Sequence, residues 1–441
     1  MEYAVKYGLT HQHFQLPEHA EVQVLSPRSL PPLDDPRAVL RAALHTPLGM
    51  CPLAQRPCPQ SIAIAVPDET RPFPLKSLLP VLLEHIASLW PAFPAQHLTI
   101  IVGGGLHCQP DRAQCERILP PEAFAHTVIG HDALHAECVR VGVTSRHTPV
   151  DINAAFVQAE LKIVLGQIDP HQFVGFTGGA KGVVIGCAGK ATIEHNHALM
   201  ARPEAQAGAV LDNPVRQDLN EAGEMVGIDL AINVVLDANK RVVALLAGNP
   251  VAVLMAGYPI SAQVYGLGLD KLFDLAIASC GGHPKDICLY QAQKGLNLAS
   301  RCVREGGKVL LVAACPQGIG DEKYEQYVRQ FSTPDQQVQE FARKGFRMGA
   351  HKALLFSNTL LRYDVGIVSE LDAQSLALCM LTKVGLQECI DAWLRQWAMQ
   401  SNARPRIAIV PNANTTFFHK NAAATDCSSA SDTLHTVTET H

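Results

Sequence analysis

The chain has 441 residues, of which 47% are hydrophobic and 17% charged, with a formal net charge of −5. This length exceeds the size at which one hydrophobic core usually keeps growing, so at least two domains are expected. The composition is that of an ordinary soluble globular protein, and the charge balance excludes the basic surface that nucleic acid or an anionic membrane would require. Small molecules are therefore the expected partners.

Thirteen cysteines are scattered from Cys51 to Cys427, with no CxxC pair and no metal-ligand spacing. We interpret them as reduced, mostly buried thiols, because disulfide frameworks are typical of short secreted chains. Residues 1–16 hold no apolar segment of a signal peptide, and no uninterrupted run reaches the roughly eighteen apolar residues of a membrane span. The sequence therefore predicts a cytoplasmic protein.

In chain order, the sequence first predicts an edge strand over residues 20–25 and a helix over 36–44, in a stretch rich in proline. Short apolar runs that each end in a turn then predict buried strands at residues 61–66, 97–102, 161–165, 273–279, 308–314 and 406–410. Helical patterns lie at residues 75–89, 192–200, 287–303 and, as one long amphipathic helix, 373–397. This alternation predicts an α/β fold with parallel or mixed sheets.

A second strand and helix unit begins near residues 265–271, so we divide the chain into two α/β domains, 1–268 and 269–421. The last residues, 422–441, have the Ala, Ser, Thr and Asp content of a disordered tail. Polar clusters follow the predicted strands at residues 68–71, 103–107, 169–181 and 281–286. Because open α/β sheets bind ligands beyond the carboxyl ends of their strands, we expect these loops to form the active site, in the cleft between the domains.

A glycine pair, Gly178 and Gly179, follows Thr177 and precedes Lys181. Glycines let a turn aim backbone N–H groups at an anion without steric cost. The Walker spacing of a phosphate-binding loop is absent, and no GxGxxG opens a helix after a strand, which argues against ordinary nucleotide binding. A lysine after a tight turn is by itself most often a surface residue, so its meaning depends on its neighbours.

Two histidines, His107 and His171, each follow a predicted strand. The unperturbed pKa of imidazole lies near working pH, so such a pair suits proton transfer on two sides of a substrate. A single histidine at a strand end is more often structural than catalytic. Two histidines with the same placement favour the catalytic interpretation.

His195 and His197 lie two apart on a predicted helix, where such residues point in roughly opposite directions. Only one of them can face a given site, which suggests a single protein ligand for a metal. Zinc would normally need three protein ligands, and the HExxH motif is absent. A metal held mostly by groups other than protein remains open.

Two more clusters are suited to binding an anion. The segment Asp68–Arg71 ends in a guanidinium that can clamp a carboxylate or phosphate. Tyr290, Gln291 and Lys294 fall within one turn of a predicted helix. In isolation, an exposed salt-bridging turn explains the first cluster better than a binding site does. A solvated helix face explains the second cluster about as well as a binding site does.

Together these motifs resemble the lactate racemase family, whose members use a nickel-pincer nucleotide. The resemblance runs from about Ser61 to Lys294. It is carried by five ordered motifs: DETRP at Asp68–Pro72, GxH ending at His107, HxxxGFTGGAK at His171–Lys181, TIxHNH ending at His197, and HPKDxxxYQAxK at His283–Lys294.

The resemblance implies that Lys181 is joined through a thioamide to a pyridinium-3-thioamide-5-thiocarboxylic acid mononucleotide that carries nickel. It implies that His197 is the protein ligand of the nickel and that His107 and His171 are the paired acid/base residues. The implied cofactor contacts fall on Asp68, Glu69, Thr70, Arg71, Thr177, Gly178 and Gly179, and the substrate contacts on Arg71, Tyr290, Gln291 and Lys294. The first domain would then bind the cofactor, and the second would contribute substrate-binding residues.

The implied activity is racemisation or epimerisation of a 2-hydroxy carboxylic acid by proton-coupled hydride transfer. One histidine would take the hydroxyl proton while the Cα hydride moves to the cofactor, and return of the hydride to the other face would invert the carbon. Lactate is the default substrate by family name. Malate, longer aliphatic or aromatic hydroxy acids and sugar acids offer the same carboxylate and hydroxyl groups. The enzymes that build the cofactor would be transient partners, and the sequence does not indicate an oligomeric state.

The chain departs from the family pattern at two places. Cys108 stands where lactate-specific members are expected to have arginine, and Ile185-Gly186 stands where Pro-Gly is usual. Two alternative functions remain: a Schiff-base lyase that uses Lys181 with His171 as the base, and a non-catalytic homologue that only binds the cofactor.

Overall fold

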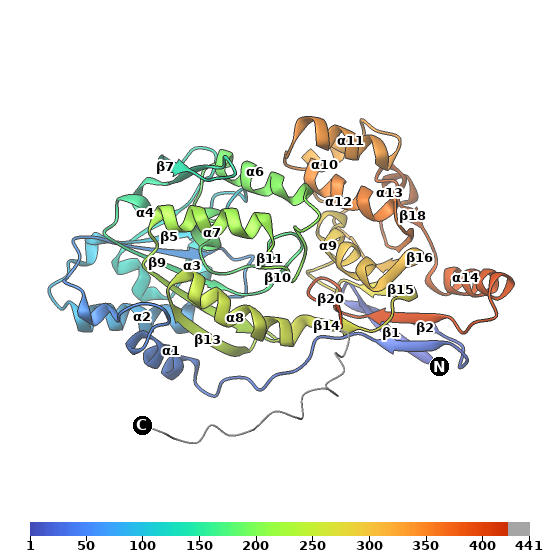
Figure 1. Ribbon diagram of the computed structural model, residues 1–441, viewed down its shortest axis with the longest axis horizontal. Helices are drawn as coiled ribbons and strands as arrows, with labels where there is room; N and C mark the ends of the chain where they lie inside the picture. Colours follow the sequence, from blue (N-terminus) through green and yellow to red (C-terminus); the bar gives the residue numbers. More distant parts are fainter. Residues whose placement is uncertain (422–441) are drawn as a thin grey trace, which may run out of the picture.

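The computed structural model describes residues 1–421, so the predicted disordered tail lies outside the described residues. Two lobes lie side by side, each built on a six-stranded sheet (Figure 1). The twelve cysteines within the described residues are all free, and seven of them are buried. Within residues 1–421, no helix is long and apolar enough to cross a membrane.

The first sheet has the strand order β13-β12-β9-β4-β5-β6, and all neighbours are parallel except β13, which runs antiparallel to β12. Its strands are β4 (Ile62–Pro67), β5 (Leu98–Gly103), β6 (Thr127–Gly130), β9 (Leu161–Gln167), β12 (Leu230–Leu236) and β13 (Val242–Gly248). The sheet is therefore mixed, and the predicted strands at 61–66, 97–102 and 161–165 are confirmed within two residues.

Helices cover both faces of this sheet. Along β4, Ile62 and Ile64 pack into one core with α1 and α2, whereas Ala63 and Ala65 pack into the other core with α7 and α8. This division follows from the alternation of side chains along a strand. The helices of the lobe are α1 (Pro36–His45), α2 (Leu75–Leu89), α3 (Arg112–Ile118), α4 (Ala154–Gln158), α5 (Lys181–Val184), α6 (Lys190–Ala198), α7 (Pro214–Val226) and α8 (Pro250–Tyr265).

The second sheet is parallel throughout, in the order β18-β17-β16-β15-β19-β3. Its strands are β3 (Glu21–Val24), β15 (Phe273–Ser279), β16 (Val303–Val312), β17 (Asp364–Val368), β18 (Thr382–Lys383) and β19 (Arg406–Val410). Strand β3 lies at the edge, as the sequence predicts. Four small ladders complete the fold: β1 (Glu2–Tyr7) with β2 (Thr10–Gln15), β7 (Cys138–Val143) with β8 (Pro149–Asn153), β10 (Pro170–His171) with β11 (Gly175–Phe176), and β14 (Gly266–Leu269) with β20 (Phe417–Lys420).

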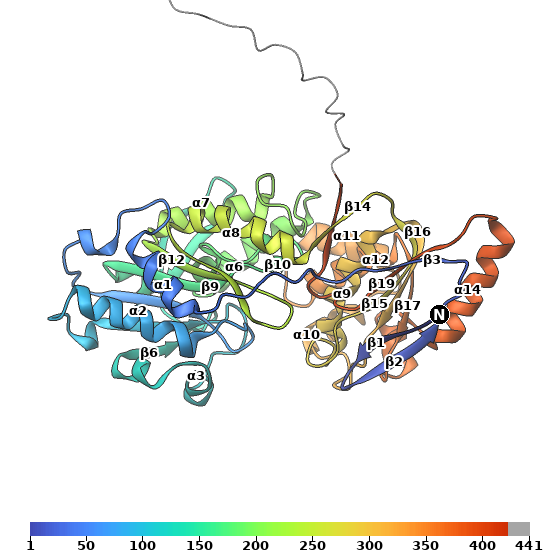
Figure 2. The same cartoon turned by 90° about the horizontal axis from the view of Figure 1, so that it is seen from below.

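The beginning of the chain joins the second lobe. Glu21 pairs with Arg406 in the parallel ladder of β3 and β19. The β1–β2 hairpin buries Val5 and Phe14 in one core with Leu275 and Ile277 of β15. Figure 2 shows the hairpin beside the second lobe and the chain crossing from β3 to α1. Residues 1–24, which we grouped with the first domain, therefore pack on the second sheet.

The helices of the second lobe depart from the sequence prediction at one place. The single helix predicted over 373–397 is wrong, because α13 ends early and a short strand, β18, pairs with β17 before α14 begins. Met380 has a positive φ of 59°, which a continuous helix does not allow. The helices are α9 (Leu289–Ala299), α10 (Glu322–Val328), α11 (Pro334–Lys344), α12 (Ala350–Leu360), α13 (Ala373–Leu378) and α14 (Leu386–Gln400).

Apolar packing joins the two lobes. Phe346 and Phe417 of the second lobe belong to the same buried cluster as Phe173 and Phe176 of the first. The rings of Phe176 and Phe417 meet edge to face, with centroids 5.6 Å apart. This contact brings α9 and α12 of the second lobe toward the β10–β11 loop of the first.

Candidate active site

Three of the predicted loops meet at the carboxyl edge of the first sheet. Segment 68–71 follows β4, segment 103–107 follows the adjacent β5, and segment 169–181 follows β9 on the other side of β4. They line one pocket, whose polar side chains are Asp68, Arg71, His107, Gln167, Thr177 and Lys181. The strand-end clusters thus come together because adjacent parallel strands end at the same edge.

Asp68 and His107 form a hydrogen-bonded pair in this pocket. His107 Nδ1 lies 2.7 Å from Asp68 Oδ2, and Thr70 Oγ1 donates to Asp68 Oδ1 at 2.6 Å. Burial favours a raised pKa for Asp68, but the hydrogen bonds from His107 and Thr70 outweigh it and hold the pKa of that carboxyl below its usual value. The ionised carboxylate fixes the His107 proton on Nδ1, which leaves Nε2 as a base.

The glycine-rich turn has a backbone that only glycine adopts readily. Gly178 has a φ of 88°, and a Cβ there would lie 2.6 Å from Ile168 Cγ1. Gly179 donates its N–H to Asn233 Oδ1 at 2.8 Å. The side chain of Arg216, which is fully buried on α7, donates to the carbonyl oxygens of Phe176 and Gly178. Sequence reasoning missed Arg216 and Asn233, because neither lies near the loop in the chain or in a recognisable pattern.

Arg216→Met is expected to lower the free energy of unfolding by about 2 kcal/mol, because it removes the hydrogen bonds that the buried guanidinium donates to the carbonyl oxygens of Phe176 and Gly178. Urea unfolding followed by circular dichroism measures the change. Arg146→Met is the matched control, since that exposed arginine bonds only Gln217 Oε1 within the described residues. Equal stability of the two variants would contradict the role of Arg216 as the support of the turn.

Lys181 opens α5 at the inner end of the turn. Burial lowers the pKa of its amine well below the usual value, and the positive charges of Arg71, Arg216 and Lys294 lower it further. A lowered pKa favours the neutral form of the amine, which is its nucleophilic form. The environment of Lys181 thus differs from that of a solvated surface lysine.

Phe173 separates two imidazoles. Its ring lies edge to face with His171 at 4.6 Å and with His197 at 5.0 Å between centroids. Burial lowers the pKa of both histidines well below the usual value, and nearby Lys181 lowers it further, so both rings are neutral. His171 Nδ1 accepts the backbone N–H of Val174 at 3.3 Å, so its neutral ring carries the proton on Nε2.

His197 and His195 point in different directions, as expected of residues two apart on a helix. His197 Nδ1 lies 3.1 Å from Asn196 Oδ1, and its ring packs against Phe346 at 5.8 Å. His195 is exposed and bonds the carbonyl oxygen of Ala191 on its own helix. A hydrogen bond from Nδ1 to Asn196 leaves the Nε2 lone pair of His197 available to a ligand.

The second lobe contributes Lys294 and Tyr290 from α9. Lys294 Nζ lies 3.5 Å from the carbonyl oxygen of Pro170, across the boundary between the lobes. Burial lowers the pKa of Lys294 to about 8, against the opposing effect of the Asp169 carboxylate. Asp169 itself has a raised pKa because it is buried, and its Oδ1 has no hydrogen-bond partner among the described residues. An unpartnered carboxylate oxygen of this kind marks a site that lacks one of its groups.

Two predicted site residues point away from this arrangement. Glu69 bonds Arg117 at 2.8 Å and Gln114 at 2.9 Å, on α3. Gln291 is exposed on α9. Thr70 and Thr177 lie at the site but act within the protein: Thr70 bonds Asp68, and Thr177 Oγ1 donates to the carbonyl oxygen of Gln167 at 2.6 Å.

The buried neutral histidines predict how stability depends on pH. His131, His171 and His351 have pKa values lowered by burial, whereas an unfolded chain titrates near 6.5. Below about pH 6.5 the unfolded state therefore binds more protons than the folded state. Each histidine is expected to cost up to about 1.4 kcal/mol of unfolding free energy per pH unit as the pH falls. Urea unfolding from pH 8 to pH 5 measures this slope, and a flat profile would contradict it.

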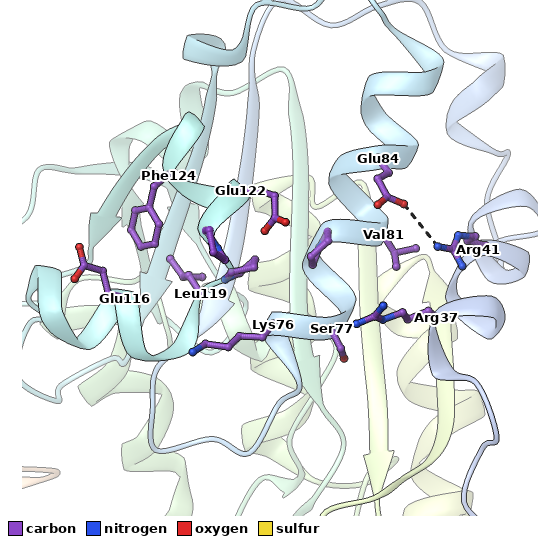
Figure 3. Close-up of a pocket in the computed structure, with 13 residues that line it drawn as sticks. Arg37, Arg41, Lys76, Ser77, Val81, Glu84, Glu116, Leu119, Glu122 and Phe124 are labelled. Atoms are coloured by element: carbon purple, nitrogen blue, oxygen red, sulfur yellow. Dashed lines mark ion pairs between the residues drawn. The ribbon is translucent and has the colours of Figure 1, made fainter.

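A second hollow lies elsewhere on the first lobe, between α1, α2 and the residues that follow α3 (Figure 3). Arg41 pairs with Glu84 across it at 3.7 Å, and Arg37 and Lys76 lie nearby. None of the predicted site residues lines it, and its lining includes no histidine or cysteine. The chemistry is concentrated at the carboxyl edge of the sheet.

The pocket at the carboxyl edge of the first sheet holds a lysine of lowered pKa and a histidine paired with a carboxylate. Two further imidazoles, His171 and His197, flank Phe173 near Lys181. Such a set of groups is typical of an enzyme active site. Residues 7–208 match the family model of the lactate racemase N-terminal domain, and residues 270–416 match that of the lactate racemase C-terminal domain. The chain belongs to the lactate racemase family and is an isomerase of the racemase type.

Two named relatives agree with this assignment. The chain is 27% identical over 318 residues to lactate racemase of Thermoanaerobacterium thermosaccharolyticum. The aligned region covers 70% of this chain and 72% of that protein. The chain is also 27% identical over 367 residues to lactate racemase of Lactiplantibacillus plantarum. The aligned region covers 80% of this chain and 83% of that protein.

Solved structures share the fold. The lactate racemase apoprotein from T. thermosaccharolyticum superimposes with a TM-score of 0.85 at 22% identity, covering 95% of this chain and all of that one. A crystal structure of a Thermotoga maritima protein gives a TM-score of 0.62 at 14% identity, covering 89% of this chain and all of that one. The two-lobed α/β architecture is thus an arrangement known from experiment.

Proposed function

We propose that the protein racemises or epimerises a 2-hydroxy carboxylic acid with a nickel-pincer nucleotide bound covalently through Lys181. Lactate is the substrate named for its relatives, and hydroxy acids with other side chains offer the same two reactive groups. The observation that carries the proposal is that Lys181 and His107 line one pocket, while His171 and His197 flank Phe173 close enough to Lys181 for its charge to lower the pKa of both.

The residues present suit such a cofactor. Lys181 offers a neutral amine, which covalent attachment requires. His197 offers an Nε2 lone pair while Asn196 orients the ring, the arrangement common for histidine ligands of metals. No group of three or more metal-binding side chains occurs within residues 1–421, so nickel here would take its remaining ligands from the nucleotide. Gly104, Gly166 and Gly182 also line the pocket, and a Cβ at Gly104 would lie 2.7 Å from Asp68 Oδ2, so glycine there keeps the carboxylate in place.

When bound, the cofactor would supply a reversible acceptor for the Cα hydride, and the protein supplies binding and proton transfer. Arg71 and Lys294 provide the positive charge for the substrate carboxylate. His107 Nε2 takes the hydroxyl proton, and Asp68 stabilises the imidazolium that results. His171 would serve the opposite enantiomer, donating a proton to the new alkoxide as an imidazolium and returning to the neutral ring, while His107 ends as the imidazolium; exchange with water would reset both histidines.

The test is racemisation of a single enantiomer labelled with deuterium at Cα, by protein produced together with the cofactor-building enzymes. We expect interconversion with the deuterium retained, because a transferred hydride does not exchange with water. Loss of the label to solvent, or an adduct between Lys181 and a keto acid that borohydride traps, would favour the Schiff-base alternative. Loaded protein that interconverts no hydroxy acid would favour a binding homologue.

A further inference from the structure

A second lysine lies beside the proposed substrate residues. Lys352 is in the first turn of α12, the helix that packs against α9. Its Nζ lies 4.9 Å from the centre of the Tyr290 ring and donates to Gln293 Oε1 at 3.1 Å. Its side chain is partly exposed, so a ligand can reach it. No carboxylate within residues 1–421 forms an ion pair with it.

Lys352 has one neutral protein acceptor. Burial and the positive charge of Lys294 together lower its pKa to about 8, while Cys288 and Asp321 act in the opposite direction. One oxygen of the Asp321 carboxylate is already used, because Oδ1 accepts the backbone N–H of Tyr324 at 2.6 Å as the cap of α10. A partly exposed ammonium without a carboxylate partner can still bind an anionic group of a ligand.

Gln293 adds a second unpaired donor. Its side chain is fully buried, its Oε1 accepts from Lys352, and its Nε2 has no hydrogen-bond partner among the described residues. Tyr290, Gln293 and Lys294 share one face of α9, since they lie three and four residues apart. The region around Lys352 therefore holds an ammonium with one neutral acceptor and an amide N–H with none among the described residues.

The remaining neighbours add no competing positive charge. His351 stacks on Phe346 at 5.0 Å and lies edge to face with Tyr290 at 6.2 Å. Burial lowers its pKa to about 3, so its ring is neutral. Lys294 and Lys352 are thus two separate cations on the substrate side of the site, whereas a simple hydroxy acid carries one carboxylate.

We propose that Lys352 binds a second acidic group of the substrate, so that the preferred substrate class is a 2-hydroxy dicarboxylate. This inference rests on the proposed function, in which Lys294 holds the carboxylate next to the hydroxyl-bearing carbon. The second carboxylate supplies the acceptor that Lys352 lacks, over the face of Tyr290. A hydrogen bond between charged groups changes affinity by about 10- to 100-fold.

The first experiment compares kcat/KM of the loaded enzyme for a four-carbon 2-hydroxy dicarboxylate and a three-carbon 2-hydroxy monocarboxylate. We expect the wild type to prefer the dicarboxylate at least about tenfold. Lys352→Met should lose this preference and retain turnover of the monocarboxylate, which also shows that the variant folds. Lys323→Met, an exposed lysine on α10, is the matched control and should behave as the wild type. A preference that persists in Lys352→Met, or none in the wild type, would overturn the inference.

The second experiment measures binding without turnover. Calorimetry with a saturated four-carbon dicarboxylate that lacks the hydroxyl should show binding to the wild-type full chain and weaker binding to Lys352→Met. If the dicarboxylate binds through Lys352 but no hydroxy acid is racemised, the dicarboxylate site stands and the proposed function fails. If monocarboxylates are racemised and Lys352→Met changes neither binding nor preference, the proposed function stands and this inference fails.

Discussion

Lys181→Ala is expected to abolish covalent cofactor attachment and to lower racemisation by about four orders of magnitude. The structure supplies the reason: burial and three neighbouring cations hold the amine neutral, so it can form the bond to the cofactor. Alanine removes the nucleophile and leaves the glycine turn intact, because Arg216 and Asn233 support that turn independently of Lys181. Intact mass and nickel content of protein produced with the cofactor-building enzymes measure the effect.

Lys190→Ala serves as the control for this prediction. Lys190 is exposed at the start of α6 and makes only a long ion pair with Glu194, at 3.9 Å. Its replacement should leave both mass adduct and nickel content unchanged. A mass adduct that survives in Lys181→Ala would show that the cofactor is attached elsewhere.

His107→Ala and His171→Ala are each expected to lower kcat by about 10²- to 10⁴-fold while cofactor loading is retained. His107 acts through Nε2 as a base, because Asp68 fixes its other nitrogen. His171 would exchange its proton through Nε2, because its Nδ1 accepts the backbone N–H of Val174. Chiral chromatography of a single enantiomer measures racemisation, and metal analysis measures loading.

His195→Ala is the control for the histidine variants, since His195 is exposed and turned away from Phe173. It should keep full activity. A double variant of His107 and His171 that still racemises at the wild-type rate would exclude the mechanism with two acid/base residues.

The sequence predicts the buried strands well. Strands β15 and β19 occupy the predicted residues, 273–279 and 406–410, because each is a short apolar run bounded by turns. Helix α2 likewise matches 75–89. The prediction of one helix over 373–397 is wrong. The helical pattern of apolar residues continues through this range, but the helix itself is interrupted by the positive φ of Met380 and by the pairing of β18 with β17. Pairing of that kind depends on distant strands.

The sequence indicates the candidate residues that lie in loops at strand ends. It does not indicate the residues that hold those loops in place from other parts of the fold. Asp68, His107 and Lys181 come together because their strands are neighbours. Arg216 and Asn233 hold the turn from other elements, and no local signal in the sequence identifies them. Glu69 belongs to the same motif as Asp68, but its carboxylate bonds Gln114 and Arg117 of α3, so a role in cofactor binding stays a prediction.

The edge strand β3 has a consequence for motion. Because β3 pairs with β19, the polypeptide passes between the lobes twice, once between β3 and α1 and again between α8 and β15 (Figure 2). Two covalent connections, together with the buried cluster of Phe173, Phe176, Phe346 and Phe417, restrict relative displacement of the lobes more than a single linker would. The lysines of α9 and α12 are thereby held in place relative to the glycine turn of the other lobe.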